Sequence, residues 1–259
     1  MTPTQLRDAL RARPAQTALF TDFDGTLSPI VADPATARPY PGAIDALAAL
    51  VGRYRRVAVL SGRPLDYLDP LLPAGIDIAA LYGLEQRIDG HRQEHPEAAH
   101  WRPIMATLAT DATDELAGHT GVTVEPKGLS LTVHFRNATR PEQAAAAVRR
   151  WAEVAGARHG LHPRAAKASV ELHPPIAVDK GTQLVAWAAG AQTVAFFGDD
   201  VGDLPAYQAV RALAATDGVE AINVLAASDE TPEELRAVTD VVLDGPPAVA
   251  QLFAELARG

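Results

Sequence analysis

Two aspartates two residues apart, Asp22 and Asp24, have the residue type and spacing that best suit chemistry in this sequence. They follow the apolar run 17–21, which has the composition of a fully buried strand. Because strand side chains alternate with a period of two, both carboxylates point the same way where the strand ends. Gly25 then lets the backbone turn sharply beside a ligand, and we assign it to substrate binding. Such a pair can hold Mg²⁺, and one member can attack phosphorus as a nucleophile. The same residues also suit a simple turn, and the spacing alone does not decide.

A second polar residue stands at the end of another predicted strand. The apolar run 57–60 ends in Ser61-Gly62-Arg63-Pro64, after which a helix is expected. The hydroxyl of Ser61 could hydrogen-bond a phosphoryl oxygen, and we assign Arg63 to substrate binding. The alternative for Ser61 is that it only caps the following helix.

Three further carboxylates, Asp199, Asp200 and Asp203, follow the apolar run 193–197. Like charges so close together repel, so we expect a cation or a strong network of hydrogen bonds. Mg²⁺ prefers a few carboxylates together with waters and phosphate oxygens, and we assign all three residues to a metal site. The alternative is a polar turn that caps the next helix, and it suits Asp203 better than Asp199.

Lys180 follows Asp179 at the start of a predicted helix. A cation at this end of a helix is unfavourable because of the helix dipole. A phosphate or the carboxylates named above would compensate for it. The alternative is a solvated lysine that pairs locally with Asp179.

The composition of the whole chain limits the classes of function. The chain has 259 residues, of which 47% are hydrophobic, enough for one large domain or two modest ones. A net charge of −9 argues against non-specific binding to nucleic acid. The lack of cysteine excludes a thiolate nucleophile and a cysteine-based zinc site. The polar start lacks the apolar region of a signal peptide, and no apolar run reaches membrane-spanning length. We therefore expect a cytoplasmic, monomeric protein without a membrane partner.

Apolar runs alternate with amphipathic segments, which predicts an α/β fold. The predicted helices span 4–13, 42–53, 65–72, 101–116, 141–157, 183–189, 204–211 and 247–257. The predicted strands span 17–21, 57–60, 122–125, 129–135, 165–172, 193–197, 221–225 and 238–243, with a hairpin around Asp89-Gly90. Between them, 99–177 has the order helix, strand, strand, helix, strand, strand, which suits an antiparallel α+β domain. We expect it to be inserted into a core made of 1–98 and 178–259.

The run Asp22-Phe23-Asp24-Gly25-Thr26 resembles the Asp-x-Asp-Gly-Thr signature of the haloacid-dehalogenase phosphatase superfamily. The resemblance implies a Rossmann-like core and an aspartyl-phosphate intermediate on Asp22. It further implies that Asp24 protonates the leaving oxygen and then deprotonates the hydrolytic water. Asp22, the backbone carbonyl of Asp24, and Asp199 would form a partial Mg²⁺ shell. In the same superfamily the second motif is a Ser or Thr at a strand end, which Ser61 fits, and the third is a lysine that steadies the nucleophile and the phosphoryl group, which Lys180 fits.

Charged side chains interrupt the apolar strands of the inserted segment: Glu125, Lys127, His134, Arg136 and Glu171. Such groups can hydrogen-bond several sugar hydroxyls and so discriminate better than an apolar pocket. We therefore assign them to substrate binding. For any one of them, an ordinary exposed position on a half-solvated sheet is the simpler alternative.

Taken together, these charged segments and the motifs at Asp22, Ser61, Lys180 and Asp199 resemble those of the trehalose-6-phosphate phosphatases. The resemblance runs from about Leu19 to Tyr207. The resemblance implies Mg²⁺-dependent hydrolysis of trehalose 6-phosphate, with 99–177 as a cap that sets substrate specificity. Gly202 and Leu204 stand where that family commonly has Thr and Glu, and Tyr82-Gly83 where it often has His-Gly. These departures leave another sugar phosphate possible, such as sucrose phosphate or a mannosyl-phosphoglycerate. The sequence also leaves open a sugar phosphomutase and a non-catalytic sugar-phosphate sensor.

Overall fold

The computed structural model describes residues 1–31, 33–166, 168–216, 218–229 and 231–258. The chain forms two compact units. Unit 1 consists of Met1–Gln93 and Val178–Gly259, and unit 2 is the continuous segment Glu94–Ala177. None of the helices in the described part of the chain combines the length and apolar character that a membrane crossing requires.

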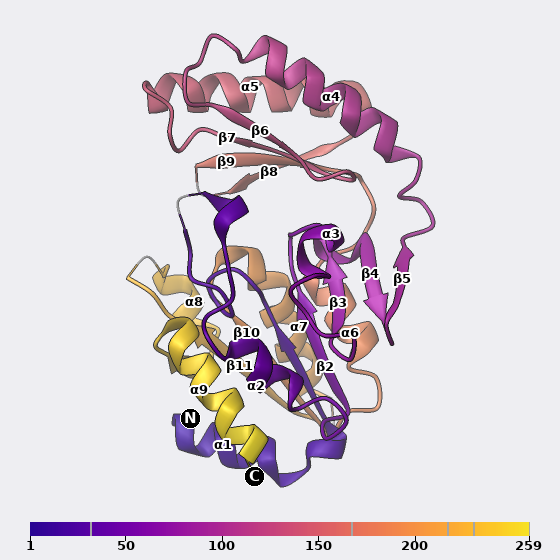
Figure 1. Ribbon diagram of the computed structural model, residues 1–259, viewed down its shortest axis with the longest axis vertical. Helices are drawn as coiled ribbons and strands as arrows, with labels where there is room; N and C mark the ends of the chain where they lie inside the picture. The colour runs from indigo at the N-terminus through magenta and orange to yellow at the C-terminus, as the bar shows by residue number, and fades with distance from the viewer. Residues whose placement is uncertain (32, 167, 217, 230, 259) are drawn as a thin grey trace. The chain divides into compact units, whose positions relative to one another are not determined.

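Unit 1 is built on one large sheet. Its strands are β1 (Thr17–Thr21), β2 (Arg56–Leu60), β3 (Asp77–Ala80), β4 (Glu85–Ile88), β5 (His91–Glu94), β10 (Thr193–Gly198), β11 (Glu220–Ala226) and β12 (Val241–Leu243). They lie in the order β12-β11-β10-β1-β2-β3-β4-β5, and the edge formed by β3, β4 and β5 can be followed in Figure 1. Neighbours from β12 to β3 are parallel, and β4 is antiparallel to β3. Strand β1 therefore lies inside the sheet, between β10 and β2.

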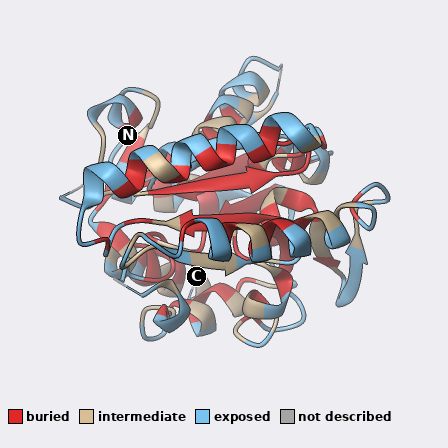
Figure 2. Ribbon diagram, turned by 90° about the horizontal axis from the view of Figure 1, so that it is seen from above, coloured by how far each residue is buried: buried red, intermediate tan, exposed pale blue. Residues whose placement is uncertain are grey.

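Helices cover both faces of this sheet. They are α1 (Pro3–Ala12), α2 (Ala43–Ala48), α3 (Leu65–Leu68), α6 (Lys180–Trp187), α7 (Leu204–Ala214), α8 (Glu233–Ala237) and α9 (Gly245–Arg258). The strand side chains alternate between two apolar clusters, as the period of two requires. Leu19 and Val57 lie in the cluster formed with α1, α2 and α9, whereas Phe20 and Ala58 lie in the one formed with α6 and α7. The strands are mostly buried, and the outward faces of the long helices are exposed (Figure 2).

Unit 2 has its own sheet and its own core. Helices α4 (Trp101–Glu115) and α5 (Pro141–His159) accompany strands β6 (Thr123–Pro126), β7 (Leu131–His134), β8 (His162–Ala166) and β9 (Ser169–His173). The strands pair antiparallel in the order β6-β7-β9-β8. Val133, Val170 and Leu172 belong to the apolar cluster formed with the two helices. Side chains at the alternate positions, such as Thr132 and Glu171, therefore lie on the opposite, polar face of the sheet.

The predicted fold class is confirmed: a largely parallel α/β sheet with an inserted antiparallel α+β unit. Several element bounds differ from the prediction. Helix α2 ends at Ala48, four residues before Gly52, whose φ of +79° no longer fits a helix. The predicted strand 165–172 is spread over the two strands β8 and β9 of a hairpin, and its Lys167 lies outside the described residues. The five-residue helix α8 was not predicted, since so short a helix carries little periodicity.

Candidate active site

The carboxyl ends of three neighbouring strands bring together the residues singled out in the sequence. Asp22 follows β1, Ser61 follows β2 and Asp199 follows β10. The Asp22 N–H donates to the carbonyl of Phe197, with an N···O distance of 2.7 Å, which fixes the start of its loop against β10. The three polar residues thus lie at one edge of the sheet because the strands are parallel and adjacent.

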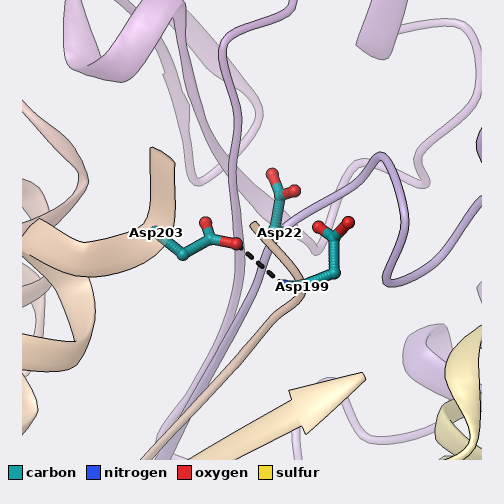
Figure 3. Close-up of side chains that lie close together, drawn as sticks. All are labelled: Asp22, Asp199 and Asp203. Atoms are coloured by element: carbon teal, nitrogen blue, oxygen red, sulfur yellow. Dashed lines mark hydrogen bonds between the residues drawn. The ribbon is translucent and has the colours of Figure 1, made fainter. Parts of the chain in front are cut away.

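Asp22, Asp199 and Asp203 form a cluster at this edge, each offering a carboxylate oxygen within 4.8 Å of the others (Figure 3). Lys180, the first residue of α6, places its ammonium nitrogen 2.7 Å from Asp22 Oδ1 and 2.6 Å from Asp203 Oδ1. Lys180 is buried, so the alternative of a solvated lysine paired with Asp179 does not describe it. Asp179 instead caps α6, by accepting the N–H of Thr182 at 2.7 Å.

The electrostatics of the cluster follow from burial and from unequal charge. Burial raises the pKa of Asp22 to about 7, and repulsion from Asp203 and Asp24 adds to this, although attraction to Lys180 opposes it. Burial and the neighbouring carboxylates also raise the pKa of Asp199 well above its ordinary value. Burial alone would lower the pKa of Lys180, but attraction to Asp203 and Asp22 outweighs it, so this pKa is raised. With more carboxylates than ammonium groups, the cluster favours an additional cation.

The donor set fits a divalent metal ion. Asp199 Oδ1 is buried and has no hydrogen-bond partner among the described residues, which is costly unless a ligand satisfies it. Gly25 leaves space beside this carboxylate, because a Cβ on Gly25 would lie 1.9 Å from Asp199 Oδ2. Oxygen ligands from carboxylates are those that Mg²⁺ and similar hard cations prefer. Asp22 and Asp199 would hold such an ion.

Asp203 differs from Asp22 and Asp199 in that both of its carboxylate oxygens accept hydrogen bonds from protein groups. Its Oδ1 accepts from Lys180, and its Oδ2 accepts from the backbone N–H groups of Asp199 and Asp200, at 2.9 and 3.2 Å. The carboxylate is buried and therefore holds together the lysine and the loop that carries Asp199. Asp200 lies apart from the cluster: it is exposed and accepts the N–H of Val201. Direct ligation by Asp203 or Asp200 stays a prediction.

Asp24 is bound to Arg63 at two points. Arg63 donates from Nε to Asp24 Oδ2 at 2.7 Å and from Nη2 to Oδ1 at 2.8 Å, and its guanidinium lies 4.5 Å from the centre of the Tyr67 ring. Such a bidentate pair fixes the orientation of the carboxylate. Ser61 is buried, and its hydroxyl oxygen accepts the N–H of Arg63 at 3.2 Å. No hydrogen bond from Ser61 to the α3 terminus occurs in the described part of the chain.

The segment 81–85, to which no role was assigned from the sequence, holds the 61–64 loop in place. The N–H of Leu81 donates to the carbonyl of Arg63, and that of Tyr82 to the carbonyl of Ser61, at 2.9 and 3.0 Å. Glu85 Oε2 accepts the N–H of Leu65 at 2.8 Å and so caps α3. Leu81 and Tyr82 both have positive φ, 46° and 61°, a backbone that costs free energy in non-glycine residues. Local sequence pattern carries no signal for these long-range contacts.

The predicted substrate-binding residues of unit 2 lie mostly together on the polar face of its sheet. Lys127 Nζ lies 3.4 Å from Glu171 Oε1 and 4.0 Å from Glu125 Oε2. His134 Nε2 lies 2.8 Å from Glu125 Oε2, and Ser130, which was not predicted, donates to Glu171 Oε1 at 2.8 Å. The structure brings these side chains into one network. Arg136 is exposed in the turn that follows β7.

The departures from the family pattern leave the cluster unchanged. Gly202 is exposed, and a Cβ there would meet no atom of the described residues within 4 Å. Leu204 is half-buried at the first position of α7. The carboxylates of Asp22 and Asp203 are instead held by the Lys180 ammonium and by backbone N–H groups. A threonine and a glutamate at positions 202 and 204 are therefore not needed for the arrangement described above.

Together, a largely parallel sheet with a buried aspartate after an inner strand and an inserted α+β unit form the fold of a solved haloacid-dehalogenase-like hydrolase from Bacteroides thetaiotaomicron, with a TM-score of 0.59 at 14% identity, covering 92% of this chain and 98% of its own. Solved structures share this fold. A trehalose-6-phosphate phosphatase related protein has a TM-score of 0.78 at 19% identity, covering 93% of this chain and 97% of its own. The C-terminal domain of the C. albicans trehalose-6-phosphate phosphatase has a TM-score of 0.75 at 21% identity, covering 98% of this chain and 96% of its own.

Sequence comparison identifies the family to which the chain belongs. The model of the trehalose-phosphatase family matches residues 20–237. The chain is 37% identical over 252 residues to the trehalose-phosphate phosphatase of Mycobacterium avium (strain 104), covering 93% of this chain and 62% of the relative. It is 37% identical over 269 residues to that of Mycobacterium leprae (strain TN), covering 98% of this chain and 60% of the relative. The chain belongs to the trehalose-phosphatase family, and it spans about 60% of the length of these curated relatives.

Proposed function

We propose that the chain is a Mg²⁺-dependent phosphatase that hydrolyses trehalose 6-phosphate to trehalose and inorganic phosphate. The observation that carries the proposal is the position of Asp22. Its carboxylate is buried at the carboxyl end of an inner strand, 2.7 Å from the Lys180 ammonium and beside Asp199. An attacking carboxylate, a cation and an acidic metal site are the parts that phosphoryl transfer needs. The substrate is proposed from membership of the family.

In the first half of the reaction, an Asp22 carboxylate oxygen attacks the phosphorus atom. The new P–O bond to Asp22 forms while the bond from phosphorus to the sugar oxygen breaks. Asp24 delivers a proton to that leaving oxygen, which departs as a hydroxyl. Lys180 stays beside Asp22 and offsets negative charge as the phosphoryl group moves onto the carboxylate.

In the second half, Asp24 takes a proton from a water molecule, which attacks the phosphorus of the aspartyl phosphate. The bond from phosphorus to Asp22 breaks, and phosphate leaves. The bidentate pair with Arg63 is the arrangement of an ionised carboxylate, which suits this second role. Proton donation in the first half requires Arg63 to release one of the two Asp24 oxygens.

Two further assignments complete the proposal. Asp22 and Asp199 hold Mg²⁺, which supplies positive charge that reduces the repulsion between the phosphate and Asp22. Unit 1 is the catalytic core, and unit 2 recognises the sugar through Glu125, Lys127 and Glu171. Their charged groups can donate to and accept from several sugar hydroxyls, and they already lie within one network.

The test of the reaction is release of inorganic phosphate from a panel of substrates. Trehalose 6-phosphate, sucrose 6-phosphate, mannosyl-3-phosphoglycerate and p-nitrophenyl phosphate are each assayed with Mg²⁺ and after chelation. We expect the highest kcat/KM for trehalose 6-phosphate, loss of turnover on chelation, and recovery when Mg²⁺ is restored. Preference for another member of the panel would overturn the substrate, and an isomeric sugar phosphate without phosphate release would indicate a mutase.

Substitutions separate recognition from chemistry. Glu171→Ala should lower kcat/KM for trehalose 6-phosphate by about 10- to 1000-fold, the scale of one or two lost polar contacts. It should leave p-nitrophenyl phosphate nearly unchanged, because that ester has no sugar. Glu153→Ala, an exposed position on α5 of the same unit, is the matched control and should change neither substrate. Lys180→Ala should damage both substrates together. Equal losses on both substrates in the Glu171 variant would remove its recognition role.

A further inference from the structure

Thr132 is a buried polar residue of unit 2 whose position the assignments above leave unexplained. The residue is 4% exposed, and its hydroxyl oxygen is out of contact with solvent. That oxygen has no hydrogen-bond partner among the described residues. A buried hydroxyl without a partner destabilises the free protein, so a ligand that supplies a partner would recover this loss.

The register of the sheet places Thr132 between the two carboxylates assigned to the sugar. On β7, Thr132 pairs directly with Glu125 of β6 on one side and with Glu171 of β9 on the other. Residues directly opposite on neighbouring strands project from the same face of the sheet. The three side chains therefore form a row across three strands, with the hydroxyl in the middle.

The ammonium group of Lys127 spans this row. It lies 3.4 Å from Glu171 Oε1 and 4.0 Å from Glu125 Oε2, the carboxylates on the two sides of Thr132. Ser130 and His134 hold the carboxylates from other directions, at 2.8 Å each. The strand neighbours of Thr132 thus carry two acceptors, and Lys127 supplies one cationic donor that lies near both.

A sugar hydroxyl matches these surroundings because it both donates and accepts. It can donate to a carboxylate while it accepts from Lys127 or from the Thr132 hydroxyl. An isosteric valine would keep the packing without leaving a buried hydroxyl unpaired. The hydroxyl of Thr132 therefore contributes favourably only when such a ligand is bound. A ring with several hydroxyls could engage the whole row at once.

We propose that Thr132 is a specificity-determining residue whose hydroxyl bonds a sugar hydroxyl that enters between Glu125 and Glu171. This inference rests on the function proposed above and adds a residue to its sugar site. Binding gives the buried Thr132 hydroxyl its partner. Thr132 takes no part in the phosphoryl chemistry, which unit 1 carries out.

The test compares Thr132→Val with Thr132→Ser and with a matched control. Thr123→Val makes the same chemical change at an exposed position two residues before Glu125, on the same face of the sheet. For Thr132→Val we expect kcat/KM for trehalose 6-phosphate to fall about 5- to 20-fold, the scale of one neutral hydrogen bond. Turnover of p-nitrophenyl phosphate should stay within about twofold, and the thermal midpoint should be unchanged or higher, since an unpaired hydroxyl has been removed. Thr132→Ser should keep most of the activity and Thr123→Val all of it.

The outcomes separate this inference from the proposed function. A Thr132→Val enzyme with normal trehalose 6-phosphate turnover, beside a Glu171→Ala enzyme that has lost it, would overturn the role of Thr132 alone. An equal loss on both substrates would also overturn it, since a residue that grips only the sugar cannot affect the small ester. If Thr132→Val fails to fold, Thr132→Ala against Thr132→Ser gives the same comparison. A wild-type enzyme that prefers no sugar phosphate over p-nitrophenyl phosphate would overturn both proposals.

Discussion

Replacing Asp203 by asparagine tests whether this carboxylate is a structural partner of Lys180. Asparagine keeps the size of the side chain and one acceptor oxygen, but it removes the charge that the buried ammonium contacts at 2.6 Å. Removing one partner of a buried ion pair costs about 3–5 kcal/mol. Because Lys180 retains Asp22 at 2.7 Å, we expect the lower end, about 3 kcal/mol.

A second effect opposes this loss when no divalent cation is bound. Carboxylate oxygens of Asp22, Asp199 and Asp203 lie within 4.8 Å of one another. Where Asp22 and Asp203 are both ionised, above the Asp22 pKa of about 7, two unit charges at that distance repel by about 3–4 kcal/mol at an effective dielectric constant of 20, and the substitution removes this repulsion. Without metal the two effects should nearly cancel. With Mg²⁺ bound, the charges of Asp22 and Asp199 are already offset, so the loss of the ion pair should dominate.

Differential scanning calorimetry of the full chain measures both conditions. For Asp203→Asn in saturating Mg²⁺, we expect the unfolding transition to fall by about 6–12 °C, given roughly 2–4 °C per kcal/mol for a chain of this size. In excess chelator the shift should be within about 2 °C. Asp200→Asn is the matched control, because it makes the same chemical change at an exposed neighbour. Asp200 accepts the Val201 N–H, whereas the Lys180 ammonium bonds Asp22 and Asp203. Equal shifts with and without Mg²⁺ would show that repulsion within the metal-free carboxylate cluster does not offset the lost ion pair.

Three further predictions concern the carboxylate cluster. Gly25→Ala should raise the Mg²⁺ concentration for half-maximal activity at least about tenfold, because the new Cβ would lie 1.9 Å from Asp199 Oδ2 and the backbone there has a φ of +78°; an unchanged Mg²⁺ dependence in a folded variant would count against it. Calorimetric titration of Mg²⁺ should show affinity rising from about pH 5.5 and levelling above the pKa of Asp22, about 7, because a proton on this carboxylate competes with the metal. By the same shift, a raised folded-state pKa, the metal-free protein should lose stability as pH rises from about 4 to 7, since the unfolded carboxylate ionises first. Flat affinity over this range would exclude Asp22 as a ligand.

The sequence was informative wherever chemistry follows directly from a buried strand. Asp22 and Asp199 come immediately after apolar runs, and the carboxyl ends of adjacent parallel strands must meet, so their proximity could be predicted. Lys180 could be placed near them because a cation at a helix start needs an anionic partner. The hairpin at Asp89-Gly90 likewise followed from its turn residues, both of which have positive φ.

Other contacts depend on details that one-dimensional pattern does not carry. The pairing of Arg63 with Asp24 joins side chains from two loops, and its geometry depends on the rotamers of both. The use of both Asp203 oxygens by Lys180 and two backbone N–H groups depends on the tight turn that follows β10. Thr132 looked like an ordinary strand residue, because the register that places it between two carboxylates is set by pairing across three strands.

The insertion of unit 2 into unit 1 has a consequence for how the chain acquires its structure. During synthesis, β1 can pair early with β2, where Leu19 lies opposite Val57. The other edge of β1 stays unpaired until β10 has been synthesised, where Leu19 lies opposite Ala195. All of unit 2 is synthesised in between, and its continuous segment can fold first. Closing so long a loop slows folding, and an unpaired apolar strand edge invites aggregation meanwhile. The strand that carries the proposed nucleophile is therefore among the last to be completed, and chaperone demand during synthesis should centre on it.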